Sequence, residues 1–296
     1  NRVILVAVFL LLFAVSACRI AVGNDYWVYR YQFLLIAQNR HVSYEVGFQA
    51  VVYLMQLLFG YDNYLPIFAL FSFLTVYFFV KAMYDQTDWF AYTLFLLMTG
   101  GYYFMSFDNV RYYSAVSIAL YAMKYVLSKN IWKFILWICV GACFHKTILL
   151  VIPVYLIARI VWNKKNVWLI PLTAIALFFG REIMKFLVFK FYPYYEGSVF
   201  ENTNVSYANI AKCGAVLIFC LIYFKPIISK YKHLYFYFNL NLGALLLYSF
   251  ASYIPELSRI CYYMLIGQIF LIPGVISRID KKWQRVLWSM LIGIAF

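Results

Sequence analysis

Long apolar runs alternate with short polar connections along almost the whole chain. Most runs approach the ~20 residues that a helix needs to cross ~30 Å of hydrocarbon. No stretch alternates apolar and polar positions as the strands of a membrane barrel do, so helices are expected. The predicted spans are residues 3–20, 64–83, 89–105, 111–127, 131–144, 146–161, 167–181, 207–224, 234–252, 259–277 and 283–296. The pattern therefore predicts an all-α polytopic membrane protein with about 10–12 transmembrane helices.

The stretch between the first two predicted spans has a different pattern. Residues 25–38, "DYWVYRYQFLLIAQ", and 44–59, "YEVGFQAVVYLMQLLF", read as helices lying on a membrane surface. The apolar part at 48–60 is short for a crossing. We therefore expect a long outer loop at about 21–63 that carries two surface helices. The alternative is a shallow crossing by 48–60, which would move the N-terminus to the other side.

Composition supports the membrane assignment, since 66% of residues are hydrophobic and only 12% are charged. Soluble domains average about 25% charged residues. No internal repeat or low-complexity linker divides the chain, so we expect a single integral membrane domain over residues 1–296.

The net charge of +14 is concentrated in short connections. Four of them carry the excess: Lys124, Lys129 and Lys133; Arg159, Lys164 and Lys165; Lys225, Lys230 and Lys232; and Arg278, Lys281, Lys282 and Arg285. Such clustering marks cytoplasmic loops and does not indicate nucleic-acid binding. Residues 101–110, 144–146, 182–206 and 253–258 then fall on the outer face, together with the 21–63 loop.

Ionisable residues at the outer ends of spans are functional candidates, because an unpaired charge there is costly. In "SFDNVRYYSAVSIALYA", Arg111 opens a helix that Asp108 and Asn109 can cap, a setting suited to phosphate. The alternative is an ordinary Asp108–Arg111 pair. In "GACFHKTILLVIPVYL", His145 and Lys146 separate two short apolar runs and could bind an anion or move a proton. A structural role for His145 is the alternative.

A third outer motif is "IPELSRICYYMLIGQIFLIP". Glu256 and Arg259 stand at a span end, with Tyr262 following. The alternative interpretation is a simple Glu–Arg pair one helical turn apart.

Two carboxylates in the outer loop complete the candidates. Asp25 lies in "GNDYWVYRY" and Glu45 in "YEVGF". Each could take a proton or bind sugar hydroxyls, and helix capping is the alternative for Glu45.

Other chemistries leave no recognisable pattern. The sequence has no HExxH, GxSxG, P-loop or dinucleotide fingerprint. The three histidines are scattered, and no DxD pair that would hold a nucleotide-sugar–metal complex is present. We therefore expect no metal site and no cofactor.

Five short stretches together resemble the EpsG-like family of Wzy-type polysaccharide polymerases. They are "VGNDYWVYRY", "YEVGF", "NVRYYSAVSIALYA", "FHKTILLVIPVYL" and "SRICYYMLIGQIFLIP", in this order over residues 20–275. Two positions depart from the family pattern. Val46 stands where the family often has proline, and Tyr112 follows Arg111 where the family often has glutamine.

The resemblance implies an enzyme that lengthens O-antigen, capsule or exopolysaccharide on the outer face of the bacterial cytoplasmic membrane. Its substrates would be oligosaccharides linked to undecaprenyl pyrophosphate, and a chain-length regulator protein could be a partner. The long outer loop also looks like that of a GT-C glycosyltransferase, by architectural analogy.

The candidate residues suit that reaction. Arg111, Arg259 and Lys146, with His145, would stabilise the pyrophosphate leaving group without a metal ion. Asp25, Glu45 or His145 would accept the proton of the attacking hydroxyl, with Asp25 the first choice. Tyr26, Asp108, Glu256 and Tyr262 would bind sugar or orient these groups.

Three other functions stay open at this stage. A flippase for lipid-linked oligosaccharides would place its charges through the membrane and often shows an inverted repeat. An O-antigen ligase would share the donor but use a lipid A acceptor. A non-catalytic scaffold of an envelope complex would need no site at all.

Overall fold

The computed structural model describes the 296-residue chain except residues 1, 192, 194–195, 198–203 and 255–256. It is 75% helical, and the described residues contain no strand. The predicted all-α class is therefore confirmed. The chain divides into two compact units, of which unit 1 comprises Asn1–Ile152 and Met290–Phe296, and unit 2 comprises Pro153–Ser289. Whether they form one domain stays a prediction, and each unit is described separately.

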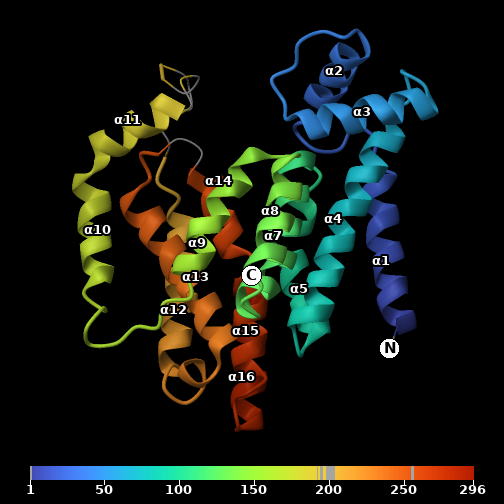
Figure 1. Ribbon diagram of the computed structural model, residues 1–296. Helices are drawn as coiled ribbons and strands as arrows, with labels where there is room; N and C mark the ends of the chain where they lie inside the picture. The colour runs from blue at the N-terminus through green and yellow to red at the C-terminus, as the bar shows by residue number, and fades with distance from the viewer. Residues whose placement is uncertain (1, 192, 194–195, 198–203, 255–256) are drawn as a thin grey trace. The chain divides into compact units, whose positions relative to one another are not determined.

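Unit 1 is built on a set of upright helices (Figure 1). Its helices outside the first loop are α1 (Arg2–Ala17), α4 (Leu65–Gln86), α5 (Phe90–Thr99), α6 (Tyr102–Met105), α7 (Val110–Leu127) and α8 (Ile131–Ala142). Helix α4 packs against both α1 and α7, and α7 also packs against α8. Ala115, Ala119 and Ala122 are fully buried on α7, and small side chains allow helices to approach closely.

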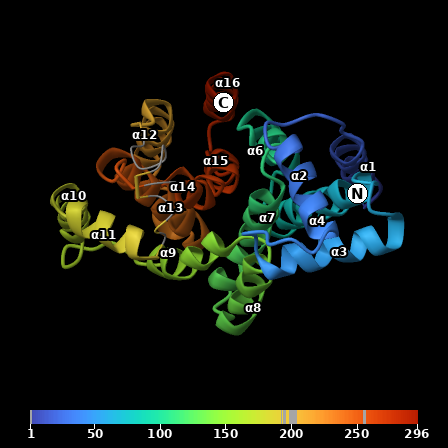
Figure 2. The same cartoon turned by 90° about the horizontal axis from the view of Figure 1, so that it is seen from above.

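Two further helices of unit 1 lie across one end of α1 and α4. They are α2 (Tyr26–Ala37) and α3 (Val46–Phe59), and Figures 1 and 2 show them beside one another above α4. Tyr29, Phe33 and Phe48 pack with Phe68 of α4 in one aromatic cluster. The two helices predicted at 25–38 and 44–59 are therefore confirmed, and burial of these rings fixes both helices on the bundle. That this loop is outside the membrane and that its helices lie on the surface stay predictions.

The short helix η1 (Lys146–Leu150) leads into α9 (Val151–Ile157), and the chain passes from unit 1 to unit 2 within α9. The later elements of unit 2 are α10 (Leu169–Phe179), α11 (Arg181–Phe191), α12 (Tyr207–Ile222), η3 (Ile228–Lys230), α13 (Lys232–Phe250), α14 (Leu257–Leu265) and α15 (Gln268–Ile276). The last helix, α16 (Lys282–Ala295), begins in unit 2 and belongs to unit 1 from Met290 onward. Helix α13 contacts α12, α14 and α15. Helix α11 was not expected, because the sequence at 182–206 reads as a polar outer loop.

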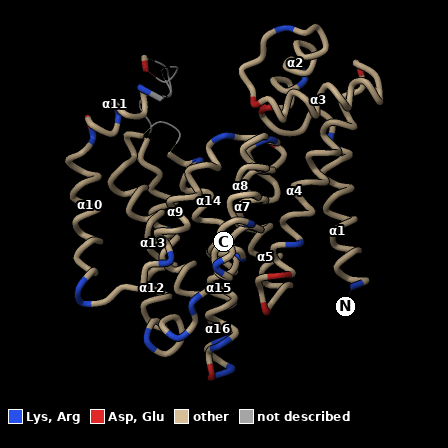
Figure 3. The backbone as a smooth tube through the Cα atoms, in the orientation of Figure 1, with Lys and Arg blue, Asp and Glu red and all other residues tan. Residues whose placement is uncertain are grey.

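Each predicted span coincides with helix, although several are interrupted. The 89–105 segment breaks at Gly100 and Gly101 between α5 and α6, and the 259–277 segment breaks between α14 and α15. By length and composition, two stretches of the described chain can cross a membrane, Leu65–Gln86 and Leu257–Ile276. Seven shorter apolar helices accompany them, so the number of spans stays a prediction. Figure 3 shows the charged residues of unit 1 gathered near the ends of its upright helices.

Candidate functional site

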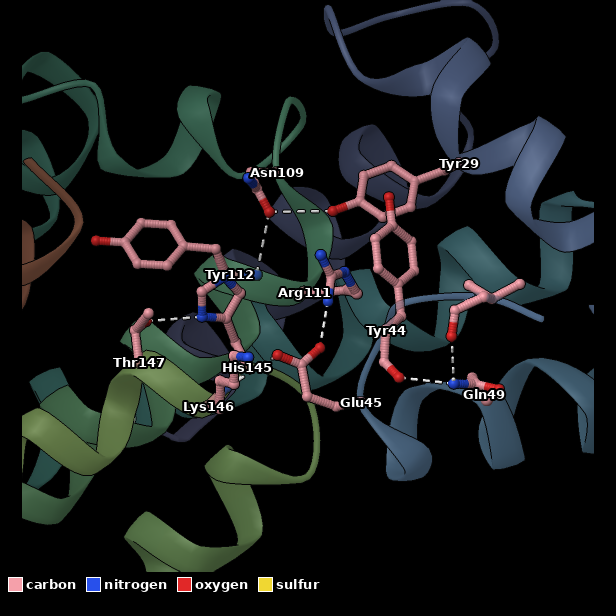
Figure 4. A network of polar contacts seen from close by, with 11 residues as sticks. Tyr29, Tyr44, Glu45, Gln49, Asn109, Arg111, Tyr112, His145, Lys146 and Thr147 are labelled. Carbon is pink, nitrogen blue, oxygen red and sulfur yellow. Dashed lines mark hydrogen bonds and ion pairs between the residues drawn. The ribbon is translucent and has the colours of Figure 1, made fainter. Parts of the chain in front are cut away.

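The first turn of α7 carries the central cation of unit 1. Asn109 is the N-cap of this helix, and its Oδ1 accepts the backbone N–H of Tyr112 at 3.3 Å. The predicted capping by Asn109 is thus confirmed. The helix starts at Val110, so Arg111 stands in its first turn and its side chain reaches toward the outer loop (Figure 4).

Arg111 pairs with a carboxylate of that loop. Its Nη1 donates to Oε2 of Glu45, which is the N-cap residue of α3 but makes no side-chain cap hydrogen bond. The guanidinium also lies 3.6 Å from the ring centroid of Tyr44, a cation–π contact. Only 12% of the Arg111 side chain and 15% of the Glu45 side chain are exposed. A pair this buried is costly to break, because either partner alone would be a desolvated charge.

The same carboxylate also binds the backbone at the start of η1. The backbone N–H of Lys146 donates to Oε1 of Glu45 at 3.0 Å, so this carboxylate bridges Arg111 and the loop after α8 (Figure 4). Free N–H groups at a helix start favour an anion. The Arg111 guanidinium and the Lys146 N–H therefore already form a small anion-binding arrangement, with Glu45 as its internal anion.

Gly47 allows this close approach of α3 to the end of α8. A Cβ at Gly47 would lie 2.6 Å from the Cβ and 2.7 Å from the carbonyl oxygen of Cys143. The next residue, Phe48, donates its backbone N–H to the same carbonyl at 3.1 Å. The glycine of "YEVGF" is therefore required where α3 meets the residues before His145.

His145 is held beside this arrangement. It is buried, its Nδ1 lies 2.7 Å from Oγ1 of Thr147, and its ring packs edge-on against Tyr112 at 5.3 Å. If Thr147 donates this bond, the ring proton is on Nε2. The backbone at His145 is extended and η1 begins at the next residue, which agrees with the predicted break between two short apolar runs.

The "GNDYW" turn packs onto the loop before α7. The N–H of Asn24 donates to Oδ1 of Asp108 at 2.7 Å. Gly23 has φ +97°, and a Cβ there would lie 2.4 Å from the carbonyl oxygen of Phe107. Asp108 therefore binds the outer loop and does not form the alternative ion pair with Arg111.

Two tyrosines of the loop surround the Arg111 charge. The Tyr29 hydroxyl donates to Oδ1 of Asn109 at 3.0 Å, and burial raises the pKa of Tyr29 to about 12. Burial also raises the pKa of Tyr44, and the Arg111 charge opposes both shifts. The carboxylate of Asp25 acts on both hydroxyls, so Asp25 belongs to this neighbourhood.

Six of the predicted site residues thus lie in unit 1, within one polar network or at its edge. They are Asp25, Glu45, Asp108, Arg111, His145 and Lys146. Tyr26 is 7% exposed and stacks on Phe68 at 5.0 Å, so it packs in the core and does not face a sugar. Arg259 and Tyr262 lie on α14 in unit 2, both half-buried. Glu256 lies outside the described residues.

The structure adds residues that the sequence pattern did not single out. Tyr44 precedes Glu45 and stacks on Arg111, Tyr29 binds Asn109, and Thr147 binds His145. Each of these residues lies in or beside a candidate motif, and that position was the sequence signal that could have identified them. The chain has 29 tyrosines, so nothing in the sequence pattern distinguishes Tyr29 and Tyr44 from the others.

Chemically, the arrangement suits a ligand with phosphate oxygens and sugar hydroxyls. A guanidinium offers N–H donors in the geometry of a phosphate, and aromatic rings beside it suit the apolar faces of sugars. Its charge is mostly desolvated, which strengthens any interaction with an anion that replaces Glu45.

Comparison with known proteins gives one family. A family profile described as the EpsG family matches residues 2–296. No curated protein and no solved structure matches the chain.

Proposed function

The chain belongs to the EpsG family of Wzy-like polymerases, and from this premise we propose that it is a polysaccharide polymerase. Family and apolar helices together identify a membrane protein. In the proposal, it joins oligosaccharide repeat units carried on undecaprenyl pyrophosphate, on the outer face of the bacterial cytoplasmic membrane. The fold would be of the GT-C type, with the 21–63 loop over the site.

The observation that carries this proposal is the Arg111–Glu45 pair with the Lys146 N–H on the same carboxylate. Three segments far apart in sequence converge there, each taken from a different motif of the family resemblance. The donors converge on one anion, and an incoming diphosphate offers the same kind of oxygen acceptors in greater number.

The proposed reaction is a direct displacement at an anomeric carbon. A hydroxyl at the non-reducing end of the acceptor repeat attacks C1 of the reducing-end sugar of the growing chain. The new C1–O bond forms as the bond from C1 to the pyrophosphate oxygen breaks. The hydroxyl proton passes to a protein base, and the lipid pyrophosphate leaves with the bonding electron pair.

Arg111 would stabilise the charge that develops on the leaving pyrophosphate, assisted by the Lys146 N–H. Glu45 would orient Arg111 and release it as the diphosphate binds. This use engages both of its oxygens, so Asp25 is the better candidate for the base. Asp25 is half-buried at the N-cap of α2, within electrostatic reach of Tyr44.

The remaining predicted residues take supporting roles in the proposal. His145, fixed by Thr147 and Tyr112, would shape the wall beside Lys146. Asp108 would hold the outer loop in place through Asn24. Arg259 and Tyr262, on α14 of unit 2, keep the roles predicted from the sequence, and a chain-length regulator protein could set when elongation stops.

Purified protein in lipid vesicles tests the proposal. With lipid-linked oligosaccharide repeats as the sole substrate, a polymerase produces a ladder of multiples of the repeat. A flippase moves the same lipid between leaflets and leaves single repeats, and a ligase produces longer molecules only when lipid A is added. Single repeats under all conditions would contradict the proposal.

A further inference from the structure

Arg19, which follows α1, is a buried cation that the site described above does not use. It is 5% exposed and stands at the end of the first apolar run. A charge this deep normally has a carboxylate partner. Yet Arg19 forms no ion pair within 4.0 Å with any carboxylate of the described residues.

One nitrogen of the Arg19 guanidinium, Nη1, holds the side chain against α1 and α4. Nη1 donates to the carbonyl oxygen of Ser16 at 3.1 Å, to Oγ of Ser16 at 3.0 Å and to Oγ of Ser72 at 3.2 Å. Ser16 also donates to Ser72 at 2.8 Å. These bonds join α1 to α4 and leave the guanidinium in a fixed place.

The faces of the same group rest near two aromatic rings. Its Cζ lies 5.3 Å from the ring centroid of Phe68 and 5.1 Å from that of Phe107. Phe107 directly precedes Asp108 and Asn109, the pair that binds the outer loop and caps α7. The Arg19 charge therefore sits directly against the turn that leads into Arg111.

The second edge of the guanidinium is not engaged. Nε and Nη2 are buried and have no acceptor within hydrogen-bonding distance among the described residues. These two N–H groups share one edge, the edge that binds a carboxylate side-on. Asp108, which follows Phe107, places a carboxylate near the Arg19 charge, and its Oδ1 accepts the N–H of Asn24.

The geometry points to Arg19 as a positioning residue of the polymerisation site, acting through the Asp108 carboxylate on the turn that carries Asn109 and Arg111. This inference rests on the proposed function. In it, the bonds from Nη1 to Ser16 and Ser72 are the anchor, and the guanidinium charge acts on the Asp108 carboxylate through space, without a hydrogen bond. Asp108 keeps the "GNDYW" turn against Phe107, and Asn109 keeps Tyr29 and the start of α7 in register.

A double-mutant cycle in the vesicle elongation assay tests this. Arg19→Met and Asp108→Asn should each lower kcat by roughly 10- to 100-fold with little change in KM, as expected when reacting groups move by about 1 Å. The double variant should be no worse than the poorer single variant, because both substitutions act on the same turn through one charge–charge interaction. Arg19→Lys keeps the charge but loses the planar guanidinium, so it should retain only part of the wild-type activity.

Matched controls come from exposed residues of the same unit. Arg40→Met and Asp62→Asn change the same charges at exposed positions and should leave kcat unchanged. Losses of Arg19→Met and Asp108→Asn that multiply in the double variant would overturn the inference, as would wild-type kcat per folded molecule in either single variant. If Arg19→Met does not fold, Arg19→Lys takes its place in the same cycle. Failure of wild-type protein to elongate, or activity of Arg111→Ala, contradicts the proposed function instead.

Discussion

The carboxylate of Glu45, at the start of α3, pairs with the guanidinium of Arg111 in the first turn of α7, across 66 positions of the chain. The same carboxylate accepts the backbone N–H of Lys146. One side chain of the outer loop therefore occupies the anion-binding donors of two other segments. The account proposed above depends on this pairing being exchangeable for a substrate phosphate.

A charge reversal separates the structural role of this pair from its chemical role. Arg111→Glu alone places two carboxylates together in a mostly buried setting and should destabilise the protein by about 3–5 kcal/mol. Adding Glu45→Arg should restore much of that stability, measured as the thermal midpoint in detergent. Elongation should stay absent, because a carboxylate on α7 repels the diphosphate.

The control for this experiment is Lys81→Ala. Lys81 pairs with Asp85 at 2.6 Å, but Asp85 keeps Lys124 at 2.5 Å, and the Lys81 side chain is 37% exposed. Its loss should cost at most about 1 kcal/mol and leave elongation intact. Recovery of elongation by the reversed Glu45–Arg111 pair would show that the pair is only structural.

Gly47→Ala should disturb the site through the close contact between α3 and the end of α8. The added Cβ would meet Cys143 at 2.6 Å, so α3 must shift and the bond from Phe48 to the Cys143 carbonyl weakens. A loss of about 1–3 kcal/mol in unfolding free energy is expected, together with reduced elongation.

Gly214→Ala is the matched comparison, because no atom lies within 4 Å of a Cβ at that position on α12. It should leave stability unchanged or slightly raised, since alanine favours helix. Equal effects of the two substitutions would contradict the close packing assigned to Gly47.

Much of the fold could be predicted from the sequence, and the reason is physical. Apolar runs predict where α1, α4, α7 and α13 lie, because a helix in lipid satisfies its backbone hydrogen bonds internally. Shorter apolar patterns predict the helices α2 and α3, and their place on a membrane surface stays a prediction. Helix α11 was missed, because Glu182, Lys185 and Lys190 interrupt its apolar residues and leave no run long enough to predict a span.

The site was only half predictable. Composition and helix ends identify Glu45, Arg111, His145 and Lys146 individually, but no local rule shows that Glu45 pairs with Arg111 rather than acting as a free base. Tertiary packing decides that choice. Arg19 was overlooked because it stands at the end of an apolar run, where arginines usually reach into the lipid headgroups.

The bond from Tyr29 to Asn109 predicts a specific alkaline response. The pKa of Tyr29 is raised to about 12, so the folded state holds this proton more tightly than the unfolded chain does. The resulting stabilisation is complete below the unfolded pKa of about 10 and is lost as pH rises toward about 12. Tyr29→Phe should therefore lose less thermal stability than wild type between about pH 10 and about pH 12.

The matched substitution is Tyr31→Phe, on the exposed side of α2. It should follow the wild-type pH dependence of the thermal midpoint. Identical pH profiles for wild type and Tyr29→Phe would contradict the assigned burial of that hydroxyl.

The contact between Thr147 and His145 makes a further prediction. Thr147→Val keeps the shape of the side chain but removes the oxygen that lies 2.7 Å from Nδ1 of His145. The ring loses the partner that holds its orientation, so the wall beside Lys146 should loosen and elongation should fall. Thr147→Ser keeps the hydroxyl and should keep elongation, and wild-type elongation by Thr147→Val would remove His145 from the proposed site.

The most direct test of the central claim is the length distribution of the products that Arg111→Ala makes from lipid-linked repeats in vesicles, per folded molecule and beside wild type. The account predicts a ladder of multiples from wild type and single repeats alone from Arg111→Ala. A ladder of wild-type length from Arg111→Ala would contradict it.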